Sequence, residues 1–164
     1  MKTSVEWKNI SSGILDVIDE HHQEMPVAIG KLAKELGLSV KLATLDAGVS
    51  GEIKKSDSGY VVRVNRHDVK ERQRFTIAHE IAHYILHREL IGDGIVDDIL
   101  YRSGLSDHLE AQANRLAADL IMPWPSLHKR IQELSDLKNE ELYEQLARDF
   151  EVSTTAMKIR LGKL

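Results

Sequence analysis

The chain has 164 residues, long enough for one domain with a hydrophobic core and a small helical appendage, and too short for two full domains. A net charge of −4, with acidic and basic residues interspersed, gives no overall attraction for nucleic acid or anionic membranes. The absence of cysteine excludes disulfides, thiolate metal sites and cysteine nucleophiles, so any metal site must use His, Asp or Glu.

Targeting segments are also not evident in the sequence. No apolar run approaches the ~18 residues of a membrane span, and the N-terminal MKTSVEWKNI lacks a signal-peptide core. We therefore expect a cytoplasmic protein with no membrane partner.

The first predicted elements are two short amphipathic helices, at residues 10–23 and 27–37. Residues 39–45 then have strand character. Residues 51–65 contain two extended runs around the turn sequence SDSG, which predicts a β-hairpin.

Longer helices are predicted at about residues 69–88 and 106–121, the second ended by the sequence PWP, and three shorter helices follow. Because the strands are grouped before the helices, the sequence favours an α+β class with a small antiparallel β-sheet packed against a helical core. We expect a main domain over residues 1–134 and a C-terminal helical subdomain over residues 135–164, packed on the same core.

Residues 75–87 carry their polar side chains on one side of the predicted helix. At ~100° per residue, one narrow stripe contains the polar residues, and apolar residues fill the opposite arc. The stripe consists of Thr76, His79, Glu80, His83 and His87. Because unpaired buried imidazole or carboxylate groups cost several kcal/mol, the stripe must face a cleft or a buried partner.

The stripe contains the pattern His79-Glu80-x-x-His83. Histidines four residues apart lie one above the other on a helix, so both imidazoles can bind a single Zn²⁺. Glu80 is displaced from the ligand axis and is placed to hold a water and take its proton during attack on a carbonyl. The alternative is a pair of structural histidines beside a surface glutamate.

A catalytic zinc needs a third protein ligand. His87 comes one turn too early to complete the same tetrahedron, and the sequence lacks the third histidine of the metzincin pattern. Glu110, at the start of the second long helix, is the best candidate, although it could instead complete a capping box with Asp107. The less convincing candidates are Asp93, Asp97, Asp98 and His108.

Further residues could support such a site. Asn114, one turn after Glu110, could orient a ligand from outside the coordination sphere. His87 could bind a transition-state oxyanion, but we favour a supporting position, either just outside the coordination sphere or at the cleft edge. Arg72 and Arg74 precede the buried part of the helix, and we expect them to be solvated.

The tail sequence LYEQLARDFEVSTTAMKIRL has the spacing of a helix-turn-helix and is accompanied by Lys158, Arg160 and Lys163. It could bind DNA, or its apolar residues could simply pack on the core. Three basic residues are few for duplex affinity, because salt weakens each phosphate contact. We therefore favour packing and do not expect direct binding of nucleic acid.

Two separated motifs, RQRFTIAHEIAHYILH and EAQANRLAADLIMP, resemble the ImmA/IrrE family of bacterial metallopeptidases, and the flanking sequences resemble those of the family from about residue 26 to 164. The resemblance implies a zincin-like fold for the main domain. It implies a gluzincin-like site with one Zn²⁺ per chain on His79, His83 and Glu110, and with Glu80 as general base.

The resemblance also implies a substrate class. Members of the family act on helix-turn-helix repressors of mobile elements or stress responses, and a single cut relieves repression. We therefore expect a repressor or antitoxin as the substrate. Because no separate N-terminal helix-turn-helix domain is evident, we expect that partner to be a separate chain.

Two functions remain open from the sequence. One is a zinc endopeptidase; the other is a non-proteolytic, metal-containing regulatory module that binds a partner, with DNA binding through the C-terminal helices as one form. Glu80 favours the first, because a zinc site that serves only as a scaffold needs no carboxylate beside a reacting water.

Overall fold

The structure, a computed structural model, describes residues 3–92, 94–98 and 106–164, with the backbone only for residues 97 and 98. Its elements are η1 (Val5–Asn9), α1 (Ser12–His21), α2 (Ile29–Glu35), β1 (Leu38–Ala43), β2 (Val49–Ser56), β3 (Gly59–Asn65), α3 (Lys70–Leu86), α4 (Arg88–Ile91), β4 (Ile95–Asp98), α5 (Asp107–Ile121), α6 (Trp124–Glu133), α7 (Asn139–Phe150) and α8 (Thr154–Arg160). The predicted helices and the hairpin are all present. Sequence analysis missed η1, α4 and β4.

The four described strands form one mixed sheet in the order β1-β3-β2-β4. β2 is antiparallel to both β3 and β4, whereas β1 and β3 are parallel. The chain reverses after β1 and leaves a gap one strand wide, which β3 fills when the hairpin turns back. The α+β class is confirmed, but the prediction of an antiparallel sheet is wrong for the pair β1 and β3.

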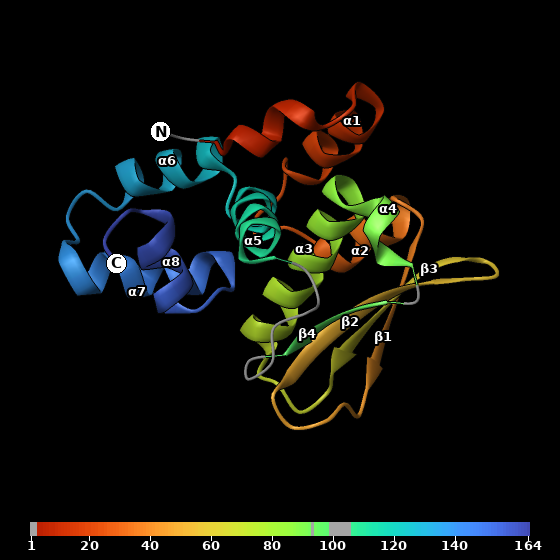
Figure 1. Ribbon diagram of the computed structural model, residues 1–164. Coiled ribbons are helices and arrows are strands. Elements are labelled where there is room, and N and C mark those ends of the chain that lie inside the picture. The colour runs from red at the N-terminus through yellow and green to blue at the C-terminus, as the bar shows by residue number, and fades with distance from the viewer. Residues whose placement is uncertain (1–2, 93, 99–105) are drawn as a thin grey trace.

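The main core lies between the sheet and two helices. Helix α3 packs against the sheet and against α5, and in Figure 1 the sheet lies on one side of α3 while α5 and the C-terminal helices lie on the other. Small residues on both helices allow this close packing: Ala78 and Ala82 on α3, and Ala113 and Ala117 on α5, are all buried. Among the described residues, no helix has both the length and the apolar character needed to cross a membrane.

The C-terminal helices share this core. Leu146, Phe150, Val152 and Met157 are buried and belong to the same hydrophobic cluster as the side chains of α3 and α5. This contact agrees with the preference for packing in the tail, while the proposed boundary after residue 134 stays a prediction.

A buried ion pair also links α8 to α5 and to the N-terminal segment. Asp119 on α5 is 1% exposed, accepts a hydrogen bond from the backbone nitrogen of Ser4 at 2.8 Å, and lies 3.0 Å from Nη2 of Arg160. Nε of Arg160 donates to the carbonyl of Met122 at 3.2 Å. Burial lowers the pKa of the Arg160 guanidinium, and the Asp119 carboxylate opposes that shift.

We expect Asp119→Asn to lower the free energy of unfolding by about 3–5 kcal/mol, because it leaves the Arg160 charge without its counter-ion. Urea denaturation measures this change. Glu140→Gln is the matched control, because Glu140 pairs with Lys158 of the same helix on the surface and should change stability by less than about 1 kcal/mol. Equal effects of the two substitutions would contradict a stabilising role for the buried pair.

Candidate metal centre

Helix α3 carries the polar stripe through the interior of the molecule. The helix begins after Val69, whose extended backbone (φ −63°, ψ 157°) precedes the first turn, and it ends at Leu86. The five stripe residues are all buried: Thr76, His79, Glu80, His83 and His87. The stripe therefore faces partners inside the fold, and α5 and β2 provide the packing surfaces on either side.

Three of the predicted site residues converge on one point. Nε2 of His79 and Nε2 of His83 lie 3.0 Å apart. The carboxylate of Glu110 lies 3.2 Å from the first nitrogen through Oε2 and 3.3 Å from the second through Oε1. One ligand atom from each residue lies within 4.8 Å of the others, so the group could hold a metal ion. Two imidazole nitrogens and a carboxylate oxygen form a donor set that Zn²⁺ prefers.

The position of Glu110 argues against its alternative role in a capping box. The N-cap of α5 is Ser106, whose hydroxyl oxygen accepts a hydrogen bond from the backbone nitrogen of Leu109. Glu110 is therefore one residue too late for the third helical position, which a capping box requires. Its side chain instead points to the two histidines.

The competing ligand candidates do not join this group in the described part of the chain. His108 is exposed, and its Nε2 accepts a hydrogen bond from the amide nitrogen of Gln112 at 3.3 Å. Asp93 and the side chains of Asp97 and Asp98 lie outside the described residues.

The side chain of Glu80 extends from α3 toward strand β2 of the sheet and is completely buried. Strand β2 approaches it closely at Gly51. A methyl group added at Gly51 would overlap the Thr76 side chain, and would lie 3.1 Å from the carbonyl oxygen of Arg63 and 3.8 Å from Oε1 of Glu80. A glycine is therefore required here for β2 to pack beside Thr76 and Glu80.

Gly51→Ala should lower the free energy of unfolding by about 1–3 kcal/mol, because the stiff Thr76 side chain and the Arg63 backbone cannot move aside easily. Gly30→Ala is the control: no atom lies within 4 Å of an added methyl group in α2, and alanine should stabilise that helix by up to about 1 kcal/mol. Thermal or urea denaturation compares the two. If Gly51→Ala were as stable as Gly30→Ala, the proposed close approach would be wrong.

His87 lies behind His83. Its Nδ1 is 3.0 Å from Nδ1 of His83, and its Nε2 is 3.0 Å from Oε1 of Gln112. Burial lowers the pKa of His87, and the hydrogen bond to Gln112 opposes that shift. His87 is 4% exposed and is not among the described residues that line the cleft, so the geometry fits the supporting role and not oxyanion binding.

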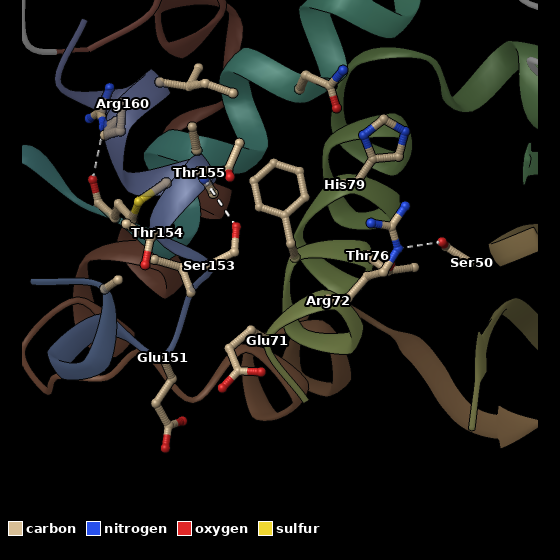
Figure 2. Close-up of a pocket in the computed structure, with 18 of the residues that line it drawn as sticks. Ser50, Glu71, Arg72, Thr76, His79, Glu151, Ser153, Thr154, Thr155 and Arg160 are labelled. Atoms are coloured by element: carbon tan, nitrogen blue, oxygen red, sulfur yellow. Dashed lines mark hydrogen bonds between the residues drawn. The ribbon is translucent and has the colours of Figure 1, made fainter. Parts of the chain in front are cut away.

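A cleft of ≈ 1390 Å³ is lined by two of the three converging residues, His79 and Glu110. In Figure 2, Arg72 of α3 reaches toward Ser50, and Ser153 and Thr154 at the start of α8 lie on the other side of α3; all four residues line the cleft. Asn114 of α5, one turn after Glu110, also lines the cleft, and its role in orienting a ligand stays a prediction.

The two arginines before the buried part of α3 differ in their environment. Arg72 is half exposed, lines the cleft and donates from Nε to the hydroxyl of Ser50 at 3.0 Å. Arg74 is largely buried and donates to the carbonyl oxygens of Glu151 at 3.1 Å and Phe150 at 3.4 Å. The expectation of a solvated Arg74 is therefore wrong, because its charge binds the unpaired carbonyls at the end of α7.

Comparisons with known proteins identify a peptidase family. Residues 22–162 match the family model of the IrrE N-terminal-like domain, a peptidase family. The metallopeptidase ImmA of Bacillus subtilis (strain 168) is 30% identical over 88 residues, which are 54% of this chain and 49% of ImmA.

A solved Mycobacterium tuberculosis transcriptional regulator shares the fold, with a TM-score of 0.61 over 97% of this chain and 49% of that chain, at 17% identity. The chain thus spans about half the length of the relatives it matches. Because the family model covers most of its residues, the chain belongs to the ImmA/IrrE family, whose model is the IrrE N-terminal-like domain.

Proposed function

We propose that this chain is a zinc-dependent endopeptidase that cuts a helix-turn-helix repressor or antitoxin and so relieves repression. The convergence of His79, His83 and Glu110, of which His79 and Glu110 line an open cleft, is the observation that carries the proposal. Glu80 follows His79 directly in the sequence. Membership of a peptidase family supports the same activity.

Four side chains share two tasks in this proposal. His79, His83 and Glu110 would hold the ion through Nε2, Nε2 and a carboxylate oxygen. When bound, zinc supplies Lewis-acid activation of water and of the peptide carbonyl. Glu80 accepts the proton of the attacking water on its carboxylate and passes it to the leaving amine. Its burial against β2 keeps the carboxylate in one orientation.

The walls of the cleft suit a segment of protein chain. Val69 and Ile159 are exposed apolar residues that line it, and Arg72 and Arg148 provide donors for backbone or side-chain carbonyls of a bound peptide. Charges of both signs are present, since Glu71, Glu144 and Glu151 also line the cleft. This mixture suits an ordinary protein segment better than a uniformly charged ligand.

The sheet offers a second element of substrate binding. β4 is an outer strand of the described sheet, and its Asp97 pairs with Gly51 of β2, the residue that packs beside Glu80. A substrate strand added along β4 would lie about 10 Å from β2, on the other side of β4, and would gain main-chain hydrogen bonds.

The charges of the tail favour a protein partner over DNA. Of the three basic residues that follow the turn, Lys158 lies 2.6 Å from Glu140, and Arg160 is held in the buried pair with Asp119. Both charges are therefore engaged within the chain. The alternative of a regulatory module that binds DNA through α8 loses most of its electrostatic basis.

A cleavage assay with the right partner tests the proposal. The zinc-loaded chain is incubated with a purified helix-turn-helix repressor of the same organism, and the products are separated by electrophoresis. A small helix-turn-helix protein encoded by a neighbouring gene would be the first candidate. We expect one internal cut that a chelator stops and added zinc restores. Tight binding of the partner without cleavage would instead establish the non-proteolytic binding module.

A further inference from the structure

We infer that Gln112 and His87 are positioning residues, which hold His83 in the tautomer that leaves its Nε2 unprotonated and able to bind a metal. The inference rests on the proposed role of His83 as a ligand. It concerns a chain of hydrogen bonds from Gln112 of α5, through His87, to His83 of α3.

The direction of this chain follows from its outer end. The amide nitrogen of Gln112 donates to Nε2 of His108, one turn earlier on α5, at 3.3 Å. The amide oxygen of the same side chain therefore faces Nε2 of His87, at 3.0 Å. An amide oxygen can only accept a hydrogen bond, so Nε2 of His87 must carry a proton.

The proton on Nε2 determines what the other nitrogen of His87 does. In a neutral imidazole one ring nitrogen donates and the other accepts, so Nδ1 of His87 is an acceptor. It lies 3.0 Å from Nδ1 of His83, which therefore donates to it. His83 is then protonated on Nδ1 and carries its lone pair on Nε2.

The lone pair is directed at the proposed metal position. Nε2 of His83 lies 3.0 Å from Nε2 of His79 and 3.3 Å from Oε1 of Glu110. The opposite tautomer of His83 would place a proton at this point and would block ligation. Histidines that bind metals commonly donate their second nitrogen to a partner that fixes the ring in this way.

This chain of hydrogen bonds, called the relay below, is built from two pairs of residues that are four positions apart in sequence. His83 lies in the last turn of α3 and His87 directly follows the helix, while His108 and Gln112 lie on the same side of α5. The packing of α3 against α5 brings the two pairs together. Since the relay lies behind His83 and outside the cleft lining, it can act on ligation without touching a substrate.

The first test is zinc affinity, measured in the full chain by competition with a chelator. Gln112→Met keeps the length of the side chain but removes the acceptor, so we expect zinc to bind about 10-fold more weakly or worse. Gln112→Glu keeps an acceptor for Nε2 of His87 and should bind zinc within about threefold of wild type. Gln145→Met is the matched control, because Gln145 also forms a hydrogen bond within one helix turn, to Asp149, and lies outside the relay.

These variants separate a positioning role from a general structural one. If Gln112→Met bound zinc as tightly as Gln145→Met, or if Gln112→Glu lost as much affinity as Gln112→Met, the inference would be overturned. Zinc affinity does not depend on cleavage, so the result stands apart from the proposed peptidase activity.

A second measurement reads the tautomer itself. Long-range ¹⁵N–¹H spectra of the full chain after zinc removal should show His83 protonated on Nδ1 in wild type and in Gln112→Glu, and a mixture of tautomers in Gln112→Met. The same mixture in wild type would overturn the inference. This spectrum tests the relay even if the wild-type chain proved unable to bind zinc, so failure of the proposed metal site and failure of the relay give different results.

Discussion

Replacement of Glu80 by Gln should lower the rate of cleavage of the cognate repressor by at least about 10²-fold, the scale of a lost general base. The substitution keeps the size and shape of a side chain that is completely buried beside β2. An amide, however, cannot accept the proton of the attacking water at neutral pH. Single-turnover cleavage of the purified partner, with enzyme in excess, measures the chemical step without product release.

The controls for this variant are zinc content and partner affinity, which should both stay near wild-type values. A loss of either would mean that the substitution disturbs the site instead of the proton transfer. A generic substrate such as casein would not serve, because the rate must be measured on a chain that the cleft recognises. If Glu80→Gln cuts the partner as fast as wild type, Glu80 is not the general base.

Removal of the carboxylate at position 110 should weaken zinc binding by at least about 10²-fold. Loss of a residue outside the coordination sphere already costs about 10–100-fold in affinity, and Glu110→Ala removes one of three proposed ligands. Its oxygens lie 3.2 Å and 3.3 Å from the two histidine nitrogens, so two imidazoles alone would remain. Metal analysis after dialysis, followed by chelator competition, measures occupancy and affinity.

Glu144→Ala is the matched control for Glu110→Ala. Glu144 lines the same cleft on the opposite wall, but it is not part of the converging group. It should therefore leave zinc affinity unchanged. Full occupancy in Glu110→Ala would show that the third ligand is another group, and an aspartate of the segment 93–98 would become the better assignment.

The pattern of apolar and polar residues predicted those features of the site that are set within a single helix. The 3.6-residue period of residues 75–87 placed the polar stripe on α3, and the spacing of His79 and His83 follows from the helix itself. Glu110 could be proposed because it stands in the first turn of a second well-patterned helix. These inferences need only the sequence within each element.

The features that sequence analysis missed depend on packing between elements. Pairing of β1 with β3 and the addition of β4 involve strands that are not adjacent in sequence, so hydrophobic pattern alone does not specify their order. Gly51 and Gln112 acquire their roles only when β2 and α5 pack against α3. The sequence held one weak signal for the role of Gln112. It stands four residues after His108, and side chains four residues apart can meet on a helix.

An anomalous difference map from crystals of the zinc-loaded chain, collected at the zinc absorption edge, would show directly whether His79, His83 and Glu110 hold one zinc ion. We expect one strong peak per chain, about 2.0–2.2 Å from Nε2 of both histidines and from a carboxylate oxygen of Glu110. A peak away from these three atoms, or a map of the zinc-loaded chain with no peak beside them, would contradict the proposed metal site.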